Sequence, residues 1–125
     1  MTPVLVRRWT LNDVHDLRIL RTGLREEISD PEFFDRVAVV ATELATNALR
    51  HGAPPAIVRL MTAPGRLIVD VSDQDLVGEP QFGLRPRPMG EGGLGLLLVR
   101  TFAADSGWYR TGHAKHAWAS FRSPP

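Results

Sequence analysis

Apolar residues recur along residues 37–52 with the spacing of a helix that buries one side. They fall at positions i, i+3, i+4, i+7 and i+11, which is the pattern of an amphipathic α-helix. These apolar residues are Val37, Val40, Ala41, Leu44 and Ala48. Asp30 and Pro31 upstream favour a capped helix start, and Gly52 favours the helix end. We therefore expect one long helix that ends at Gly52 and packs against the rest of the chain.

Two polar residues lie along one edge of that apolar stripe. Glu43 and Asn47 are four residues apart, so they share a helix face. A carboxylate can orient or deprotonate a nucleophile, and an amide oxygen is a hard ligand suited to Mg²⁺. The alternative is an ordinary solvated helix face, and the two residues alone do not decide between these interpretations.

The remaining pattern predicts another helix, over residues 12–28, and two β-hairpins. The expected strands share short, β-rich runs bounded by turn residues, and they cover residues 4–9, 56–62, 66–72, 107–110 and 116–122. These elements predict an α/β (α+β) two-layer sandwich in a single domain of residues 1–125. Its mixed, mostly antiparallel sheet would be covered on one face by helices.

Residues 78–95 interrupt the regular pattern, because half of them are glycine or proline. A helix is predicted after them, over residues 94–104, so the glycine-rich run lies against a helix N-terminus. Glycines let backbone N–H groups approach an anion, and the helix dipole adds positive potential there. The segment is neither a Walker P-loop nor a good dinucleotide fingerprint. It indicates a phosphate-binding loop only weakly by itself.

Composition narrows the classes of function. With 15 basic and 14 acidic residues, the net charge of +1 argues against a nucleic-acid binder that relies on a basic face. Cysteine is absent, which excludes a disulfide framework and a thiolate metal site and fits a reducing cytosol. No apolar run approaches the length of a membrane span. We therefore expect a cytoplasmic protein that binds neither membranes nor nucleic acid directly.

Three further polar residues were considered as ligands. Asp73 follows a predicted strand end, a frequent position for ligand sites as well as for solvated loops. His113 and His116 lie in or near the turn of the second hairpin, with no acidic partner close in sequence. We therefore predict no metal site at the two histidines.

The order of these features resembles that of the GHKL ATPase superfamily with its Bergerat ATP-binding fold. Within it the chain is most similar to the bacterial anti-sigma factor serine/threonine-kinase family. The motifs are the helix segment ELATNALRHG, the strand ending before Asp73, and the later run GLGLLLV. The resemblance covers residues 4–122.

The resemblance implies roles for individual residues. Glu43 would be the general base, Asn47 the Mg²⁺ ligand, and Asp73 the acceptor of the adenine amino group. The segment 78–95 would be the ATP lid, and ATP and Mg²⁺ would be the cofactors. The remaining implied ATP-binding residues belong to the glycine motif and the last hairpin, and they are Gly90, Gly92, Gly93, Leu94, Gly95 and Lys115.

The implied activity is phosphorylation of an anti-sigma-factor antagonist by a protein that also binds a sigma factor. The resemblance is compatible with a homodimer. Two departures favour an alternative, a regulatory binding module with weak or no nucleotide binding. The usual Asp-x-Gly-x-Gly glycines do not follow Asp73, and His116 rather than threonine follows Lys115. A further alternative is a stand-alone histidine-kinase-like catalytic domain.

Overall fold

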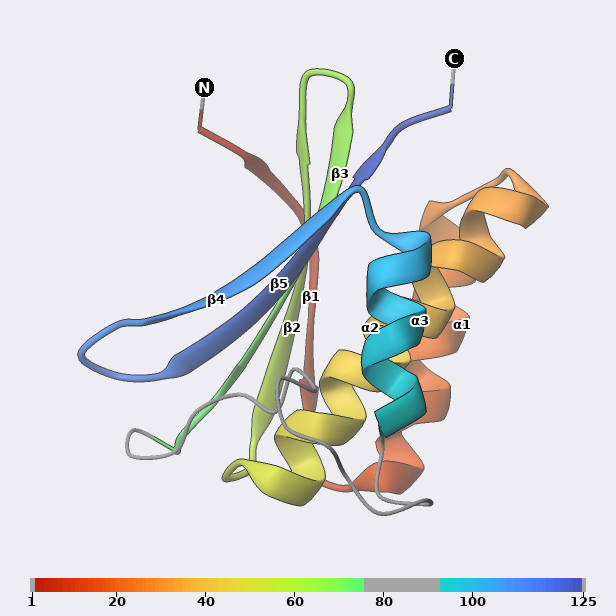
Figure 1. The fold of residues 1–125 in the computed structure, drawn as a ribbon. Helices are drawn as coiled ribbons and strands as arrows, with labels where there is room; N and C mark the ends of the chain where they lie inside the picture. Colours follow the sequence, from red (N-terminus) through yellow and green to blue (C-terminus); the bar gives the residue numbers. More distant parts are fainter. Residues whose placement is uncertain (1, 76–92, 125) are drawn as a thin grey trace.

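The computed structural model describes residues 2–75 and 93–124, with side chains in the last helix described from residue 97 onward. Helices and strands follow in the order β1 (Val4–Leu11), η1 (a 3₁₀ turn, Val14–Asp16), α1 (Leu17–Glu27), α2 (Pro31–His51), β2 (Ala56–Ala63), β3 (Arg66–Asp73), α3 (Gly93–Phe102), β4 (Asp105–Arg110) and β5 (Lys115–Arg122). The strands form one sheet in the order β1-β2-β3-β5-β4, and its described pairings are all antiparallel. The helices lie on one side of this sheet (Figure 1). The predicted two-layer α+β fold is confirmed.

Helix α2 forms the centre of the core, as its apolar pattern predicted. All five residues of the predicted stripe are buried, together with the aromatic residues Phe33 and Phe34 of its first turn. The Asp30 carboxylate accepts a hydrogen bond from the backbone N–H of Phe33 at 2.8 Å, which satisfies one of the free donors of the helix start. Pro31 occupies the first turn and Gly52 ends the helix.

The facing sheet residues alternate as a half-buried strand requires. Leu67, Val69 and Val71 of β3 are buried in the same cluster as the α2 stripe. The hairpin between β2 and β3 turns at Gly65, whose φ of 70° lies in the left-handed region that glycine tolerates best. Asp70, on the opposite face of β3, is also buried, which alternation alone does not predict.

The start of the first helix differs from the sequence-based expectation. The Asp13 carboxylate caps a short turn before the helix, because it accepts the backbone N–H of His15 at 2.8 Å, and no side-chain hydrogen bond caps α1 itself. The short η1 turn precedes α1, and Val14 is exposed rather than part of the apolar stripe. Local side-chain bonding to the backbone replaces the first helical turn here.

Helix α1 docks on β1 where a glycine meets an indole ring. A Cβ built on Gly23 would lie 2.4 Å from Nε1 of Trp9, so only glycine allows this approach. The Trp9 ring is 5% exposed, and its Nε1 has no hydrogen-bond partner within the described residues. The nearby Arg7–Glu27 ion pair at 3.3 Å is largely solvated and adds only about 0.2–1 kcal/mol. Apolar packing therefore holds α1 in place.

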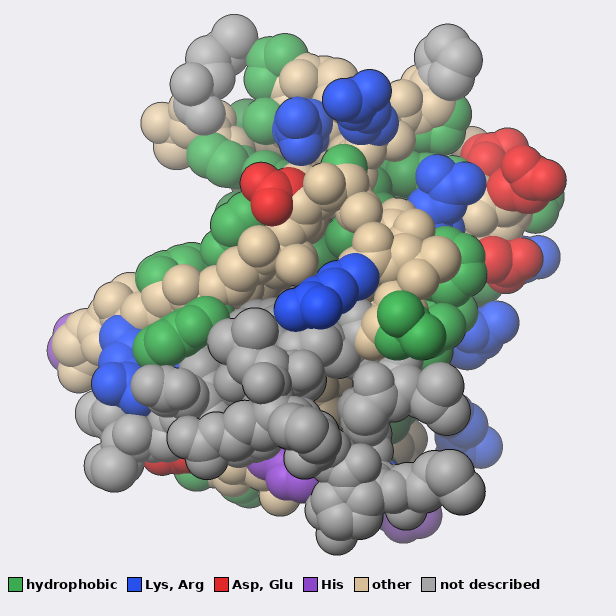
Figure 2. All heavy atoms as spheres, in the orientation of Figure 1, with side chains coloured by type: hydrophobic (Ala, Val, Ile, Leu, Met, Phe, Trp, Pro, Cys, Tyr) green, Lys and Arg blue, Asp and Glu red, His purple; other side chains and the backbone are tan. Residues whose placement is uncertain are grey.

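Charged side chains of both signs are dispersed over the face seen in Figure 2, and acidic and basic groups lie next to one another at its right edge. This agrees with the nearly neutral net charge. Among the helices that the structure describes, none is long and apolar enough to cross a membrane.

Gly23→Ala should destabilise the protein by about 1–3 kcal/mol, because the new methyl group forces the buried indole of Trp9 out of its place. Denaturant unfolding measures the loss. Gly112→Ala is the matched control, because a Cβ there meets nothing within 4 Å. Its free energy of unfolding should stay within about 0.5 kcal/mol of the original. Equal effects of the two substitutions would contradict this account of the α1–β1 contact.

Candidate functional site

The candidate site lies where α2 ends. The C-terminus of α2, the C-terminal end of β3 and the N-terminus of α3 all lie toward the lower end of the molecule in Figure 1. The lower half of α2 presents Glu43 and Asn47, both half-buried. Within residues 2–75 and 93–124, neither side chain makes a hydrogen bond or an ion pair. A partly shielded carboxylate and amide without protein partners are available to a ligand.

Asp73 is the last residue of β3 rather than the first residue of a loop, and it is 3% exposed. Its Oδ1 accepts the backbone N–H of Asp75 at 2.8 Å and that of Ala53 at 3.3 Å. Its Oδ2 lies so close to the end of α2 that a Cβ on Gly52 would be 2.4 Å away. The helix end and the strand end are therefore joined through one carboxylate, and Gly52 is required for this close approach.

Lys115 lies beside this carboxylate, in a strand that begins one residue before the predicted strand 116–122. It is the first residue of β5 and the cross-strand partner of Asp73. Its Nζ is 3.7 Å from Oδ2 of Asp73 and 3.5 Å from Oδ2 of Asp75. The lysine is 4% exposed, so the cation is held inside the protein by carboxylates.

Glu43 and Asn47 lie on α2, and Asp73, at the end of β3, contacts that helix at its C-terminus. At 1.5 Å per residue, Asn47 lies about 7.5 Å and Glu43 about 13.5 Å before Gly52 along the helix axis. Asp73 contacts Gly52. Along the direction of α2, the Asp73 carboxylate, the Asn47 amide and the Glu43 carboxylate therefore follow one another. This spacing suits an elongated ligand with different chemical groups at its two ends.

The glycine motif is only partly within the described residues. Gly90 and Gly92 lie outside them, as does most of the predicted lid at residues 78–95. The backbone of Gly93, Leu94 and Gly95 forms the first turn of α3, which begins one residue earlier than predicted. Because α3 is ten residues long, its first turn carries free backbone N–H groups and the positive end of a helix dipole.

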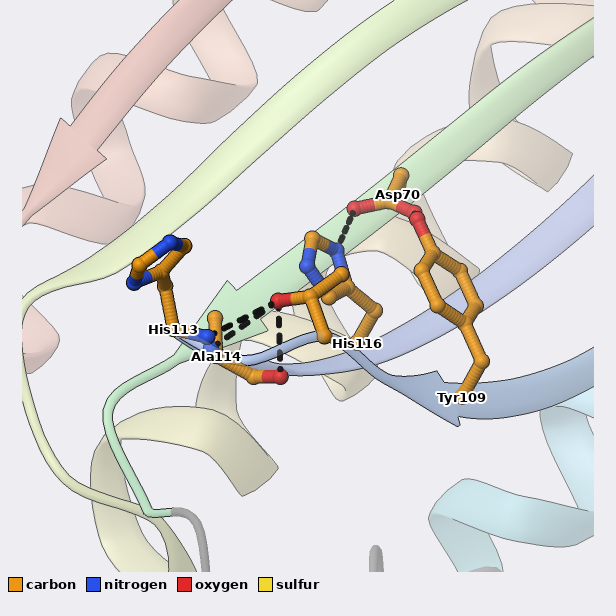
Figure 3. Close-up of polar contacts among 6 residues, drawn as sticks. Asp70, Tyr109, His113, Ala114 and His116 are labelled. Atoms are coloured by element: carbon orange, nitrogen blue, oxygen red, sulfur yellow. Dashed lines mark hydrogen bonds and ion pairs between the residues drawn. The ribbon is translucent and has the colours of Figure 1, made fainter.

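A second polar cluster lies on the sheet face opposite the helices, and the sequence analysis did not foresee it (Figure 3). Asp70 accepts a hydrogen bond from the Tyr109 hydroxyl at 2.7 Å, and its other oxygen lies 2.8 Å from Nδ1 of His116. The rings of Tyr109 and His116 stack, with centroids 4.4 Å apart. His116, which has no acidic partner close in sequence, therefore has one in the fold. The partner comes from β3, 46 residues away in sequence.

This cluster fixes the outer hairpin to the centre of the sheet and changes the acidity of the tyrosine. Burial raises the pKa of Tyr109 to about 12, and the hydrogen bond to Asp70 and its negative charge act in the same direction. The positive charge of Arg59 opposes them only partly. Within the described residues no group of three or more His, Asp or Glu side chains could hold a metal ion.

The chain belongs to the histidine kinase-like ATPase domain family, which it matches over residues 11–121. The residues that form the candidate site all fall inside this match. Membership implies an ATP-binding fold, and it agrees with the resemblance to the GHKL superfamily that the motifs indicated.

A solved structure with the same fold is the crystal structure of the RsbU and RsbW domains of Rv1364c from Mycobacterium tuberculosis. The TM-score is 0.67 at 17% sequence identity, over 98% of this chain. This chain spans 32% of that longer protein, so the similarity concerns the fold of one part of it. No curated protein matches the sequence.

The raised pKa of Tyr109 predicts an alkaline change in stability with a defined sign. In the unfolded chain the phenol ionises near its ordinary pKa of about 10, whereas in the folded protein it stays neutral up to about 12. The contribution of neutral Tyr109 to the free energy of unfolding is therefore complete below pH 10 and is lost as the pH rises from 10 to 12. Tyr109 is the only tyrosine, so tyrosinate absorbance measures its pKa directly.

Tyr109→Phe removes the titrating phenol. The variant should therefore lack the part of the alkaline loss of stability that ionisation of Tyr109 causes. Denaturant unfolding at several pH values between 9 and 12 compares the two proteins. A tyrosinate midpoint near 10 in the folded protein would contradict the hydrogen bond to Asp70.

Proposed function

We propose that this protein is an ATP- and Mg²⁺-dependent regulatory serine/threonine kinase of the anti-sigma type. It would bind a sigma factor and phosphorylate an antagonist protein, and a homodimer is the assembly proposed for it. Family membership supports the nucleotide, and the placement of Glu43 and Asn47 on α2, with Asp73 of β3 at the end of that helix, supports its orientation. The observation that carries the proposal is the pair Glu43 and Asn47, half-buried and unbonded on one helix face.

In this proposal the adenine base of ATP lies at the C-terminal end of α2, and the phosphates extend toward the middle of that helix. Asp73 would accept a hydrogen bond from the base, and Asn47 would lie level with the phosphates. The first turn of α3 would add backbone N–H donors to the phosphate oxygens. Phosphoryl transfer depends mainly on positioning and on charge neutralisation, which such an arrangement supplies.

The donor set at Asn47 fits Mg²⁺ only together with a nucleotide. Mg²⁺ prefers six oxygen ligands and commonly takes several from waters and substrate phosphates. One neutral amide oxygen is too little to retain the ion alone, and the described residues hold no cluster that would replace the phosphates. Bound Mg²⁺ would neutralise phosphate charge, while Asn47 would fix its position relative to Glu43.

Glu43 would act as the general base. Its carboxylate would accept the proton of the attacking serine hydroxyl or of a water molecule. Partial burial limits competing solvent at this side chain. Glu43 lies more than two helical turns before Gly52, where Asp73 contacts the helix. Recognition of the adenine base and phosphoryl transfer would therefore occur at opposite ends of the nucleotide.

A second candidate function is a binding module of the same fold with weak nucleotide affinity. The observation that favours it is the buried contact between Lys115 and Asp73, because it occupies the carboxylate that is proposed to bind adenine. Calorimetry with ATP, in the presence and absence of Mg²⁺, separates the two functions. Mg²⁺-dependent binding supports the kinase, and no binding supports the module.

Glu43→Gln should lower ATP-dependent phosphate release by at least about 100-fold, because the general base is lost, with nucleotide affinity nearly unchanged. Asp35→Asn is the control, since it removes an exposed carboxylate from the same helix. Phosphate release and calorimetry give the two quantities. Full activity of the Glu43 variant would refute its role as base.

Asn47→Ala should weaken ATP binding in the presence of Mg²⁺ and leave the weaker, metal-free binding unchanged. The reason is that only the metal-bound nucleotide uses the amide oxygen. An unchanged Mg²⁺ dependence would refute the ligand assignment while leaving nucleotide binding itself intact.

A further inference from the structure

The open face of the sheet, opposite the helices, carries a row of apolar side chains. Every helix that the structure describes lies on the other side of the sheet (Figure 1). Leu5 of β1, Met61 of β2 and Ile68 of β3 are successive cross-strand partners, so they share one face. It is the open face, because Ile68 and the Asp70 of Figure 3 are two residues apart in β3. These three residues form the apolar row, and Leu5 is 53% exposed.

Arginines lie on both sides of the apolar row. On one side, Arg8 and Arg59 are cross-strand partners in β1 and β2. Like charges directly opposite each other destabilise a sheet, so this pair is unfavourable in the free protein. On the other side, Arg66 donates a hydrogen bond to the Ser120 hydroxyl at 3.2 Å. Within residues 2–75 and 93–124, none of the three arginines forms an ion pair.

The acidic residues of the open face do not neutralise these arginines. Asp70 is the cross-strand partner of Arg59, but its two oxygens are engaged by the Tyr109 hydroxyl and by Nδ1 of His116, and the residue is 3% exposed (Figure 3). Asp105, the other acidic residue on this face among the described residues, lies in the edge strand β4. The open face therefore presents positive charge on both sides of exposed apolar surface.

We propose that the apolar row docks one amphipathic α-helix of a protein partner, apolar on the contacting side and acidic along both flanks. Asp70, opposite Arg59, lies four residues from Arg66 in β3, so the two levels of arginine are about 13 Å apart. A helix with its side chains is about 10–12 Å wide, so carboxylates on its two flanks reach both levels. Arginine binds carboxylates through paired hydrogen bonds, and a carboxylate between Arg8 and Arg59 offsets their repulsion.

Two other occupants fit this face less well. A second copy of the chain, packed face to face about a two-fold axis, brings arginines against arginines. Single-stranded nucleic acid binds by stacking bases on free aromatic rings, whereas the apolar row is not aromatic and the Tyr109 ring already stacks on His116. The proposal is independent of the proposed nucleotide site, because that site lies along α2, on the other side of the sheet (Figure 1).

The test is a titration of the full chain with a fluorescent synthetic peptide that forms a helix with a leucine seam and glutamate flanks. The matched probe is the same peptide with glutamine in place of every glutamate. The glutamate peptide should bind at least about tenfold tighter, the size of one hydrogen bond between charged groups. Added salt should reduce this difference. Equal binding of the two peptides, or binding of neither, overturns the proposal.

Arg8→Thr and Arg66→Thr should each weaken binding of the glutamate peptide by about threefold. Arg8→Thr should also leave the free energy of unfolding unchanged or higher, because it removes a like charge opposite Arg59. Arg100→Gln is the matched control, since it removes an exposed arginine from α3 in the helical layer. An equal loss of affinity in all three variants contradicts docking on the open face.

Methyl NMR of the isoleucines locates the peptide on the original protein. The signal of Ile68 should shift on addition of the glutamate peptide, whereas that of Ile19, which is 59% exposed on α1, should not. A shift of Ile19 without one of Ile68 overturns the proposal. A single-stranded oligonucleotide of the same net charge should not displace the peptide, and displacement would assign the face to nucleic acid instead. Calorimetry with ATP tests the proposed function separately, so the two can fail independently.

Discussion

The structure depends on the packing of one side of α2 against the antiparallel sheet. This contact buries the apolar stripe from Val37 to Ala48 and fixes the rotation of the helix about its axis. With the rotation fixed, the neighbouring edge that carries Glu43 and Asn47 has a fixed direction as well. The polar residues therefore need no bonds of their own to be oriented, which explains how they stay unbonded and half-buried.

The end of α2 adds a second constraint, at Gly52. The helix terminus, the start of β2 and the end of β3 converge there, and the carboxylate of Asp73 bonds to backbone on both sides. The same group closes the framework and faces the proposed ligand. Asp73 therefore cannot change its partners without loosening the contact between the helix end and the strand end.

Features that depend on neighbouring residues, such as helix period, helix ends and hairpin turns, could be predicted from the sequence. The period of α2, its Asp30 cap, the Gly52 terminus and the hairpin at Gly65 were all foreseen and are confirmed. Pairings between distant strands were not, because periodicity carries no information about register. Lys115 therefore fell outside the predicted strand 116–122, and His116 had no acidic partner close in sequence, whereas the register of β3 with β5 gives both residues acidic neighbours. The roles of Glu43, Asn47 and the glycines stay predictions.

The single buried lysine has a consequence for the outside of the molecule. The other 14 basic residues are all arginine, whose guanidinium stays charged at any physiological pH. Acetylation or ubiquitin conjugation acts on lysine amines, and the one such side chain in this sequence is enclosed by carboxylates in the sheet. Lysine acetylation therefore cannot neutralise the positive charges on the surface of this protein, because arginine carries them.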